Sequence, residues 1–170
     1  MKPLVGLPGT YLVKATDTGN NDEFLGFAGW QTPERKPLMN LFRRDAVDKL
    51  NFAKRVGWTE AEVEEMWSNV DTSLCDAALG AYDAVRHEIM DDEGHWFLAP
   101  LWVFPEHQGQ GVAGLLLRHV MAIADSYSPP QPMYLEAHPT ARPIYERLGW
   151  VGCEGKKFAM VRRGPKTDMV

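Results

Sequence analysis

The chain has 170 residues, of which 45% are hydrophobic and 24% charged, and its formal net charge at pH 7 is −5. This composition is that of an ordinary globular protein, and the length predicts a single domain over residues 1–170. The acidic balance disfavours a nucleic-acid partner, which needs a basic face. No stretch resembles a signal peptide or approaches the roughly 18 apolar residues of a membrane span. We therefore expect no membrane partner and a cytoplasmic protein, with a nuclear location left open.

Two short apolar runs, residues 11–15 and 24–30, are separated by turn-forming residues, which predicts a β-hairpin. From residue 38 to residue 92 the apolar period is helical, which predicts a helical segment. Within it, Thr59 and Glu62 have the spacing of a capping box, and Asp71 is a candidate cap for a further helix. The apolar face of that further helix would carry Leu74, Ala78, Ala81, Val85 and Ile89.

Residues 96–104 are apolar nearly throughout, which is typical of a strand buried on both faces. Pro100 cannot donate to a ladder, so it requires a bulge or an open strand edge. The pattern then predicts a helix over 112–127, a strand over 133–137, a helix over 139–148 capped by Thr140, and a strand over 157–162. Residues 1–9 form a lead-in without a period, and residues 164–170 a disordered tail. Together these elements predict a mixed α/β (α+β) domain with a central sheet.

The most informative segment joins the apolar strand to the next helix through Gly109 and Gly111. A turn of this kind leaves backbone N–H groups unpaired at the positive end of the helix dipole, where a phosphate can bind. Glycine also lets the backbone approach a ligand closely and adopt a positive φ. Two interpretations stay open here, because the same glycines could simply form a tight turn between strand and helix.

A dinucleotide-binding protein is a less favoured alternative. Residues 109–114 satisfy G-x-G-x-x-G, and Glu136 lies 22 residues after Gly114, close to the dinucleotide-binding fingerprint. However, residues 106–108 separate the strand from the first glycine, and only 34 residues follow Glu136. The upstream region also predicts a hairpin and helices instead of βαβ units. We therefore rank a nicotinamide- or flavin-binding protein below the alternatives that follow.

Two blocks of the sequence resemble the GNAT superfamily of acyl-CoA-dependent N-acetyltransferases, and fungal GNAT-domain proteins most of all. The family core Gln/Arg-x-x-Gly-x-Gly/Ala is matched by Gln108, Gly111 and Ala113, preceded by Leu98, Leu101, Val103 and Pro105. The family's second block, Asn-x-x-Ala-x-x-Leu-Tyr-x-x-x-Gly-Phe, is matched by His138, Ala141, Ile144, Tyr145, Leu148, Gly149 and Trp150. The two blocks are separated by one helix and one strand, as in the family.

The resemblance implies a GNAT-like central twisted mixed sheet with flanking helices. A helical insertion, residues 38–92, is implied between the strands that are numbered 3 and 4 in the family's sheet. It also implies direct transfer of an acetyl group from acetyl-CoA to a primary amine on a small-molecule or peptide acceptor. The implied cofactor-binding residues are Leu101, Trp102, Val103, Gln108, Gly109, Gln110, Gly111, Val112, Ala113, Gly114 and His138. Tyr145 stands where the family places the proton donor to the CoA thiolate.

An alkylamine has a pKa near ~10.4, so a base must remove a proton before the amine can attack. Glu136, at the end of the strand beside the cofactor strand, is the first candidate for this base. His95, just before the cofactor strand, is the second, and Glu106 is the third. No set of His, Cys, Asp and Glu shows metal-ligand spacing in the sequence, so we expect no metal.

The family has a strand and two helices before the hairpin, whereas ten residues precede Tyr11 here. We therefore expect these elements, which in the family form one wall of the acceptor site, to be missing. A truncated chain, the helical insertion, or a partner subunit in a homodimer would each account for that wall. The alternative function is accordingly a non-catalytic acyl-CoA-binding or assembly module.

Overall fold

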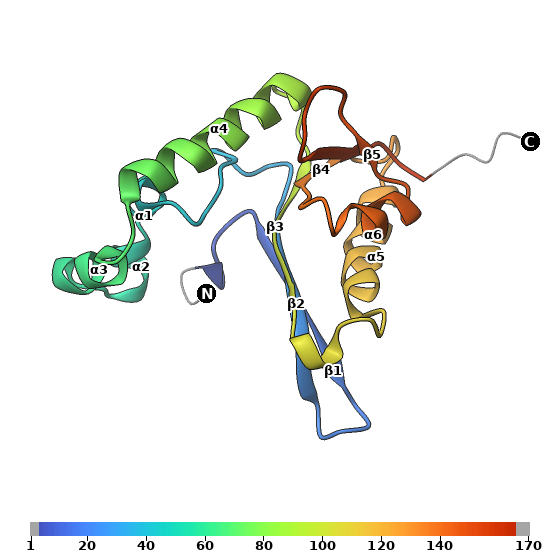
Figure 1. Ribbon diagram of the computed structural model, residues 1–170, viewed down its shortest axis with the longest axis horizontal. Coiled ribbons are helices and arrows are strands. Elements are labelled where there is room, and N and C mark those ends of the chain that lie inside the picture. Colours follow the sequence, from blue (N-terminus) through green and yellow to red (C-terminus); the bar gives the residue numbers. More distant parts are fainter. Residues whose placement is uncertain (1–3, 166–170) are drawn as a thin grey trace, which may run out of the picture.

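The computed structural model describes residues 4–165, and a six-stranded sheet forms its centre (Figure 1). The strand order is β1-β2-β3-β4-β6-β5, in which β3 and β4 are parallel and the other neighbours antiparallel. The strands are β1 (Thr10–Asp17), β2 (Glu23–Gln31), β3 (Trp96–Val103), β4 (Met133–Glu136), β5 (Val151–Gly152) and β6 (Ala159–Arg162). This mixed sheet with flanking helices confirms the predicted fold class.

The N-terminal hairpin forms as predicted, with β1 and β2 paired from Thr10 opposite Gln31 to Asp17 opposite Glu23. Pro100 lies within β3, at a bulge against β2. Ala28 pairs with Leu101 and Trp30 pairs with Leu98, so Ala99 and Pro100 together lie opposite Gly29. The bulge that Pro100 required is therefore present. The strand keeps its hydrogen-bond ladder on both sides of it.

The two faces of the sheet are covered by different helices (Figure 1). Helix α5 (Val112–Asp125) packs on one face, where Leu98 and Leu135 join its buried side chains in the main core. Helix α4 (Thr72–Met90) packs on the other face, where its Met90 contacts Phe97 and Tyr134. Successive residues of a strand point to opposite faces, which explains why neighbours in sequence belong to different cores. We call these the α5 face and the α4 face.

The predicted insertion contains four helices, α1 (Arg44–Lys49), α2 (Phe52–Val56), α3 (Glu60–Trp67) and α4. The capping box of Thr59 and Glu62 forms at the start of α3. Asp71 caps α4 by accepting a hydrogen bond of 2.9 Å from the backbone N–H of Leu74. The expectation of an unstructured lead-in was wrong for Leu4 and Leu7. Both are buried against the insertion, because its amphipathic helices need apolar partners.

The apolar face predicted for α4 packs only in part. Val85 and Ile89 are partly buried against the core of the α4 face, whereas Leu74 is 69% exposed, and the fully buried residues of the helix are Arg86 and Met90. Arg86 donates hydrogen bonds to Asp83 and to the carbonyl oxygen of Leu38, both at 2.7 Å, and its guanidinium lies 4.2 Å from the centre of the Phe97 ring. A paired and hydrogen-bonded arginine therefore occupies a place that hydrophobic periodicity assigns to aliphatic residues.

The C-terminal elements differ slightly from the predictions. Helix α6 (Arg142–Arg147) starts three residues later than expected, and the Thr140 hydroxyl is hydrogen-bonded to Nδ1 of His138 at 2.9 Å instead of capping the helix. Strand β5 was not predicted, because it has two residues. Residues 166–170 of the predicted tail lie outside the described residues. Within the part that the structure describes, no helix is both long and apolar enough to span a membrane.

Candidate active site

The parallel strands β3 and β4 separate halfway along the sheet. Their pairing covers Trp96–Leu98 against Met133–Leu135 and then ends. Beyond that point β4 continues only alongside β6, and β3 remains paired with β2 through Val103. The edge of β3 that faces α5 and α6 therefore carries backbone polar groups without a strand partner among residues 4–165. Such an edge can accept an extended ligand in the manner of an added strand.

The open edge of β3 leads through a short 3-10 turn, η2 (Pro105–His107), to the glycine turn that starts α5. Gly109 and Gly111 have φ angles of 75° and 84°, in the left-handed region that favours glycine. No atom lies within 4 Å of the place where a Cβ would stand on either residue. Gln108 ties the turn to the strand by donating a 3.1 Å hydrogen bond to the carbonyl oxygen of Val103. The space beside the backbone of both glycines, next to the start of α5, is thus open.

A cleft of about 750 Å³ connects these features with α6. Eight of the predicted cofactor-binding residues line it: Leu101, Val103, Gln108, Gly109, Gly111, Val112, Ala113 and Gly114. Tyr145 lines the wall that α6 contributes. The strand edge, the glycine turn and the second sequence block are therefore brought together in one cleft.

Three of the predicted cofactor-binding side chains lie outside this cleft. The Trp102 side chain is on the other face of the sheet, against Phe27 and Phe104, because it alternates with Leu101 and Val103 along β3. Gln110 instead donates a 3.0 Å hydrogen bond to the carbonyl oxygen of Glu106. His138 is exposed beside Thr140. The neighbours of Trp102 and Gln110 in the sequence line the cleft, so the backbone groups of these two residues, but not their side chains, lie near it.

Tyr145 is buried between the cleft and the core, with its ring 6.2 Å from that of Trp150. Burial raises the pKa of its hydroxyl to about 12, because an ionised phenolate would lose its hydration. No hydrogen bond of this hydroxyl occurs within the described residues. Tyr145 is therefore a protonated donor at neutral pH with its hydrogen-bonding capacity free.

Glu136 ends β4 at the point where the strands separate, on the same face as Tyr134 and α4. Burial raises the pKa of Glu136 to about 7, while Arg86 opposes the rise and Asp83 adds to it. Its Oε1 is buried and has no hydrogen-bond partner among residues 4–165. A carboxyl group of this kind exchanges a proton close to neutral pH, as a general base must.

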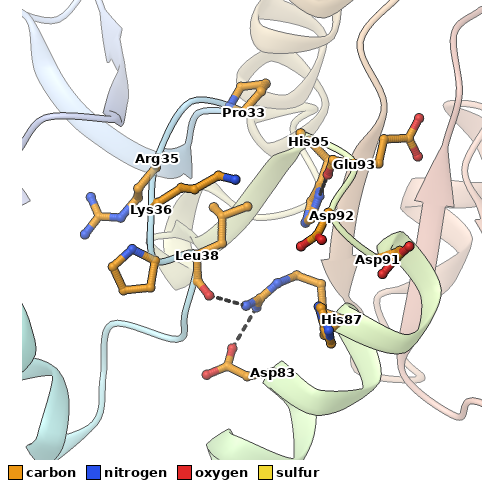
Figure 2. A pocket seen from close by; sticks show the side chains of 13 residues that line it. Pro33, Arg35, Lys36, Leu38, Asp83, His87, Asp91, Asp92, Glu93 and His95 are labelled. Atoms are coloured by element: carbon orange, nitrogen blue, oxygen red, sulfur yellow. Dashed lines mark hydrogen bonds and ion pairs between the residues drawn. The ribbon is translucent and has the colours of Figure 1, made fainter.

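His95 lies at the start of β3, before the paired part of the strand, and it does not line the cleft. Its Nδ1 is 2.7 Å from the carbonyl oxygen of Glu93, and burial is the main cause that lowers its pKa. His95 instead lines a second cavity, which lies beside the C-terminal end of α4 (Figure 2). Glu106, the third candidate base, is exposed in η2.

The sequence reasoning did not identify two basic residues of the cleft, Arg118 and Arg147. Arg118 lies one turn beyond Gly114 on α5, and its Nη1 is 3.0 Å from the place of a Cβ on Gly114. Neither arginine forms an ion pair within residues 4–165. Arg118 follows Gly114 by four residues on a predicted helix, and this spacing is the sequence signal that could have identified a cation beside the glycine turn.

Comparison with known proteins gives a family and a fold. The acetyltransferase (GNAT) domain family matches residues 80–161. A crystal structure from Corynebacterium glutamicum ATCC 13032, described as histone acetyltransferase HPA2 and related acetyltransferase, is 21% identical with a TM-score of 0.50. The alignment covers 96% of this chain and 68% of that one. A mosquito arylalkylamine N-acetyltransferase-like 5b structure is 16% identical with a TM-score of 0.51, over 89% and 73% of the two chains. No curated protein matches the sequence.

Proposed function

Residues 80–161 match the GNAT acetyltransferase domain family, and on this premise we propose that the protein transfers an acetyl group from acetyl-CoA to a primary amine. The observation that carries the proposal is the open edge of β3, which leads through the short turn η2 into the glycine turn of α5. This arrangement offers backbone hydrogen bonds to an extended chain and, next to them, an N-terminal helix dipole to an anion. A pantetheine arm joined to a pyrophosphate has these two parts in that order.

The residues of the cleft fit acetyl-CoA. Its volume of about 750 Å³ is in the range of pockets that hold cofactors. The open space over Gly109 and Gly111 leaves room for phosphate oxygens close to the backbone. Arg118 and Arg147 add positive charge without an acidic partner of their own. Leu101 and Val103 would hold the pantetheine through their backbone groups, and the glycine turn would hold the pyrophosphate.

Bound acetyl-CoA supplies the acetyl group as an activated thioester. The protein must take a proton from the acceptor ammonium and give a proton to the departing thiolate. We assign the first role to Glu136, whose carboxylate sits where β3 and β4 separate. We assign the second role to Tyr145, a protonated donor in the cleft wall. Starting from the ammonium, two N–H bonds and the C–S bond break while a C–N bond and an S–H bond form. One proton goes to Glu136 and from there to solvent, and the other replaces the proton that Tyr145 gives to the thiolate.

Glu136 is favoured over His95 as the base because of position. Glu136 follows directly on Leu135, the last residue of β4 that pairs with β3, whereas His95 precedes Trp96, the first residue of β3 that pairs with β4. The paired segment of the two strands therefore separates His95 from the gap through which an amine would meet the thioester. Glu106 lies beyond the other end of β3, in the exposed turn η2.

A calorimetric titration of the purified protein with acetyl-CoA, with NAD as the control ligand, tests cofactor binding. We expect micromolar binding of acetyl-CoA alone, and preference for NAD would refute the cofactor assignment. Release of CoA thiol is then measured with a panel of amines. Arylalkylamines belong in the panel because the mosquito neighbour is named for them, and alkylamines and peptide amines complete it. Tight binding of acetyl-CoA with no thiol release from any amine would favour the non-catalytic acyl-CoA-binding module.

A further inference from the structure

A second cavity, of about 270 Å³, lies between the loop of residues 33–38 and the C-terminal end of α4 (Figure 2). It shares no lining residue with the cleft that holds Tyr145. Three of the side chains that line it, His87, Asp91 and Asp92, come from the last turn of α4 and the residues after it. The proposed acetyl transfer uses none of these three.

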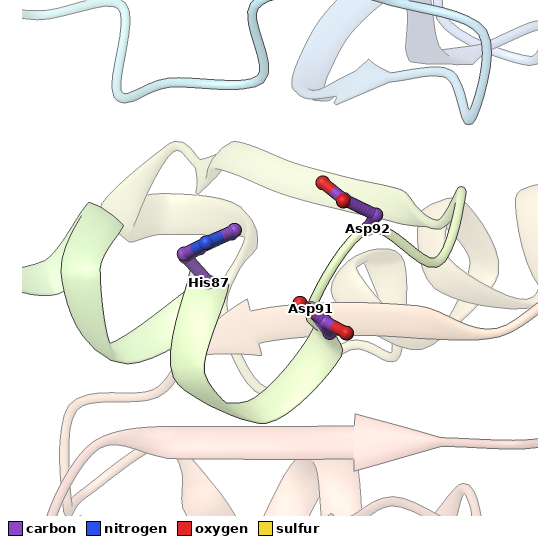
Figure 3. A group of neighbouring side chains, drawn as sticks. All are labelled: His87, Asp91 and Asp92. Carbon is purple, nitrogen blue, oxygen red and sulfur yellow. The ribbon is translucent and has the colours of Figure 1, made fainter.

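The side chains of His87, Asp91 and Asp92 converge (Figure 3). One ligand atom from each, an imidazole nitrogen or a carboxylate oxygen, lies within 4.8 Å of the others. His87 and Asp91 are four residues apart, which places them over one another at the end of the helix. No metal was predicted from the sequence, because the spacing of His87, Asp91 and Asp92 matches none of the familiar ligand motifs. The fold brings the ligands together.

The cluster is negatively charged without a cation from the protein to balance it. The C-terminal end of α4 adds the negative pole of the helix dipole to the two carboxylates. Asp91 and Asp92 form no ion pair among the residues that the structure describes. Arg86 pairs with Asp83 and Arg163 with Glu93, and Arg35, which lines the cavity, donates hydrogen bonds to Pro8 and Thr10 and pairs with neither carboxylate. Lys36 lines the same cavity but pairs with neither carboxylate.

His95 gives an independent sign of a ligand in this cavity. It is only 3% exposed, and its Nδ1 lies 2.7 Å from the carbonyl oxygen of Glu93. A carbonyl oxygen can only accept, so Nδ1 carries the proton and Nε2 of the neutral ring carries a lone pair. Nε2 is buried without a partner among residues 4–165, although His95 lines the cavity together with Asp92. A buried lone pair on a residue that lines this cavity calls for a hydrogen-bond donor or a cation.

We propose that His87, Asp91 and Asp92 bind a divalent transition-metal ion, and that Nε2 of His95 accepts a hydrogen bond from a water molecule bound to that ion. One imidazole and two carboxylates form a ligand set that suits zinc, cobalt or nickel better than magnesium or calcium. A polar group in the outer shell, such as His95, orients the bound water. The site joins the end of α4 to the turn before β3, away from the acetyl-transfer cleft.

The test titrates the purified 170-residue protein, first stripped with a chelator, with Co²⁺ by absorption spectroscopy and with Zn²⁺ by calorimetry. We expect one ion per chain and weaker binding of Mg²⁺. His87→Gln and Asp92→Asn, both exposed positions, should each weaken Co²⁺ binding at least tenfold, and His95→Gln should weaken it about tenfold. Glu60→Gln and His119→Gln are matched controls on other exposed surfaces and should leave the affinity unchanged.

Absence of saturable Co²⁺ binding at millimolar concentration would overturn the proposal. Binding that persists unchanged in His87→Gln and Asp92→Asn would overturn it as well, because another surface would then hold the ion. Equal affinity for Mg²⁺ would contradict the role of the imidazole. None of these measurements depends on acetyl transfer, so the metal site and the proposed function stand or fall separately.

Discussion

Tyr145 and Glu136 lie on opposite faces of the sheet, on either side of the point where β3 and β4 separate. Tyr145 packs in the core beneath α5, whereas Glu136 follows Tyr134 on the face that α4 covers. This relationship permits a thioester to enter from one face and an amine from the other. An acid and a base would then act on the two ends of one reaction without contacting each other.

Glu136→Gln should lower kcat by about 100-fold while leaving the affinity for acetyl-CoA unchanged, because the amide cannot take a proton. In the unsubstituted protein the carboxyl group must be ionised to act, and its pKa is raised to about 7. Activity should therefore fall as the pH decreases through 7, and the pH–rate profile of CoA release measures this. A profile with no inflection near neutral pH would remove Glu136 from the reaction.

The same substitution should stabilise the protein at alkaline pH. A carboxyl group whose pKa rises from 4.5 unfolded to about 7 folded binds its proton more tightly in the native state. The raised pKa therefore stabilises the folded protein at low pH, where the carboxyl group is neutral. This contribution is lost as the pH rises from 4.5 through 7. Urea unfolding at pH 8 should show Glu136→Gln more stable by up to about 3 kcal/mol. At pH 4 the two proteins should be nearly equal, and equal stability at both pH values would contradict the raised pKa.

Tyr145→Phe should reduce turnover at least tenfold with little change in acetyl-CoA affinity, because only the proton to the thiolate is lost. The free energy of unfolding should hardly change, since the hydroxyl has no hydrogen bond within the described residues to lose. Steady-state kinetics and calorimetry separate the two effects. Tyr11→Phe, which removes a hydroxyl that contacts His119, is the matched control. Unaltered turnover in Tyr145→Phe would exclude this hydroxyl from the mechanism.

Gly111→Val should abolish acetyl-CoA binding, because a branched side chain would occupy the space over the turn and resist the φ of 84°. Gly57→Val provides a matched control, since Gly57 also has a positive φ of 75° and open space around it but lies at the end of α2. Both variants should lose a similar stability from backbone strain, about 1–2 kcal/mol. Only Gly111→Val should lose the ligand in calorimetry. Retained affinity in a folded Gly111→Val protein would argue against the phosphate cradle.

Arg118→Ala should weaken acetyl-CoA binding about tenfold and reduce its dependence on salt, because a charged contact with a phosphate is lost. Arg55→Ala, an exposed arginine on α2, should change neither quantity. Titrations at low and high ionic strength make the comparison. If the two variants behave alike, the charge beside Gly114 plays no part in binding.

Much of the fold was predictable because its signals are local. The hairpin, the capping box at Thr59, the cap at Asp71 and the strand that ends at the glycine turn all follow from neighbouring residues. The buried face of α4 was predictable only in part, through Val85 and Ile89. It also contains Arg86, whose partners Asp83 and Leu38 and whose contact with Phe97 depend on three separate segments.

In the candidate site, too, the features with local sequence signals were predictable and those that depend on the fold were not. The glycine turn and Tyr145 were identified because each lies in a contiguous block of sequence, and the fold places them in one cleft. Their chemical roles remain predictions. The direction of the Trp102 side chain depended on strand alternation around the bulge at Pro100, and the convergence of His87 with Asp92 depended on how α4 ends. Neither arrangement has a pattern in the sequence.

The open side of β3 has a consequence for the behaviour of the whole molecule. An unpaired strand edge on a protein surface is a template for association with other chains, yet this edge lies inside, flanked by α5 and α6. A folded neighbour cannot reach it, whereas a slender ligand can. The backbone amides of residues 99 and 101–103 that face this side should therefore exchange with solvent quickly in the free protein and slowly in the liganded one. Hydrogen exchange would thus report cofactor occupancy from the middle of the sheet, at the place where a sheet is ordinarily most protected.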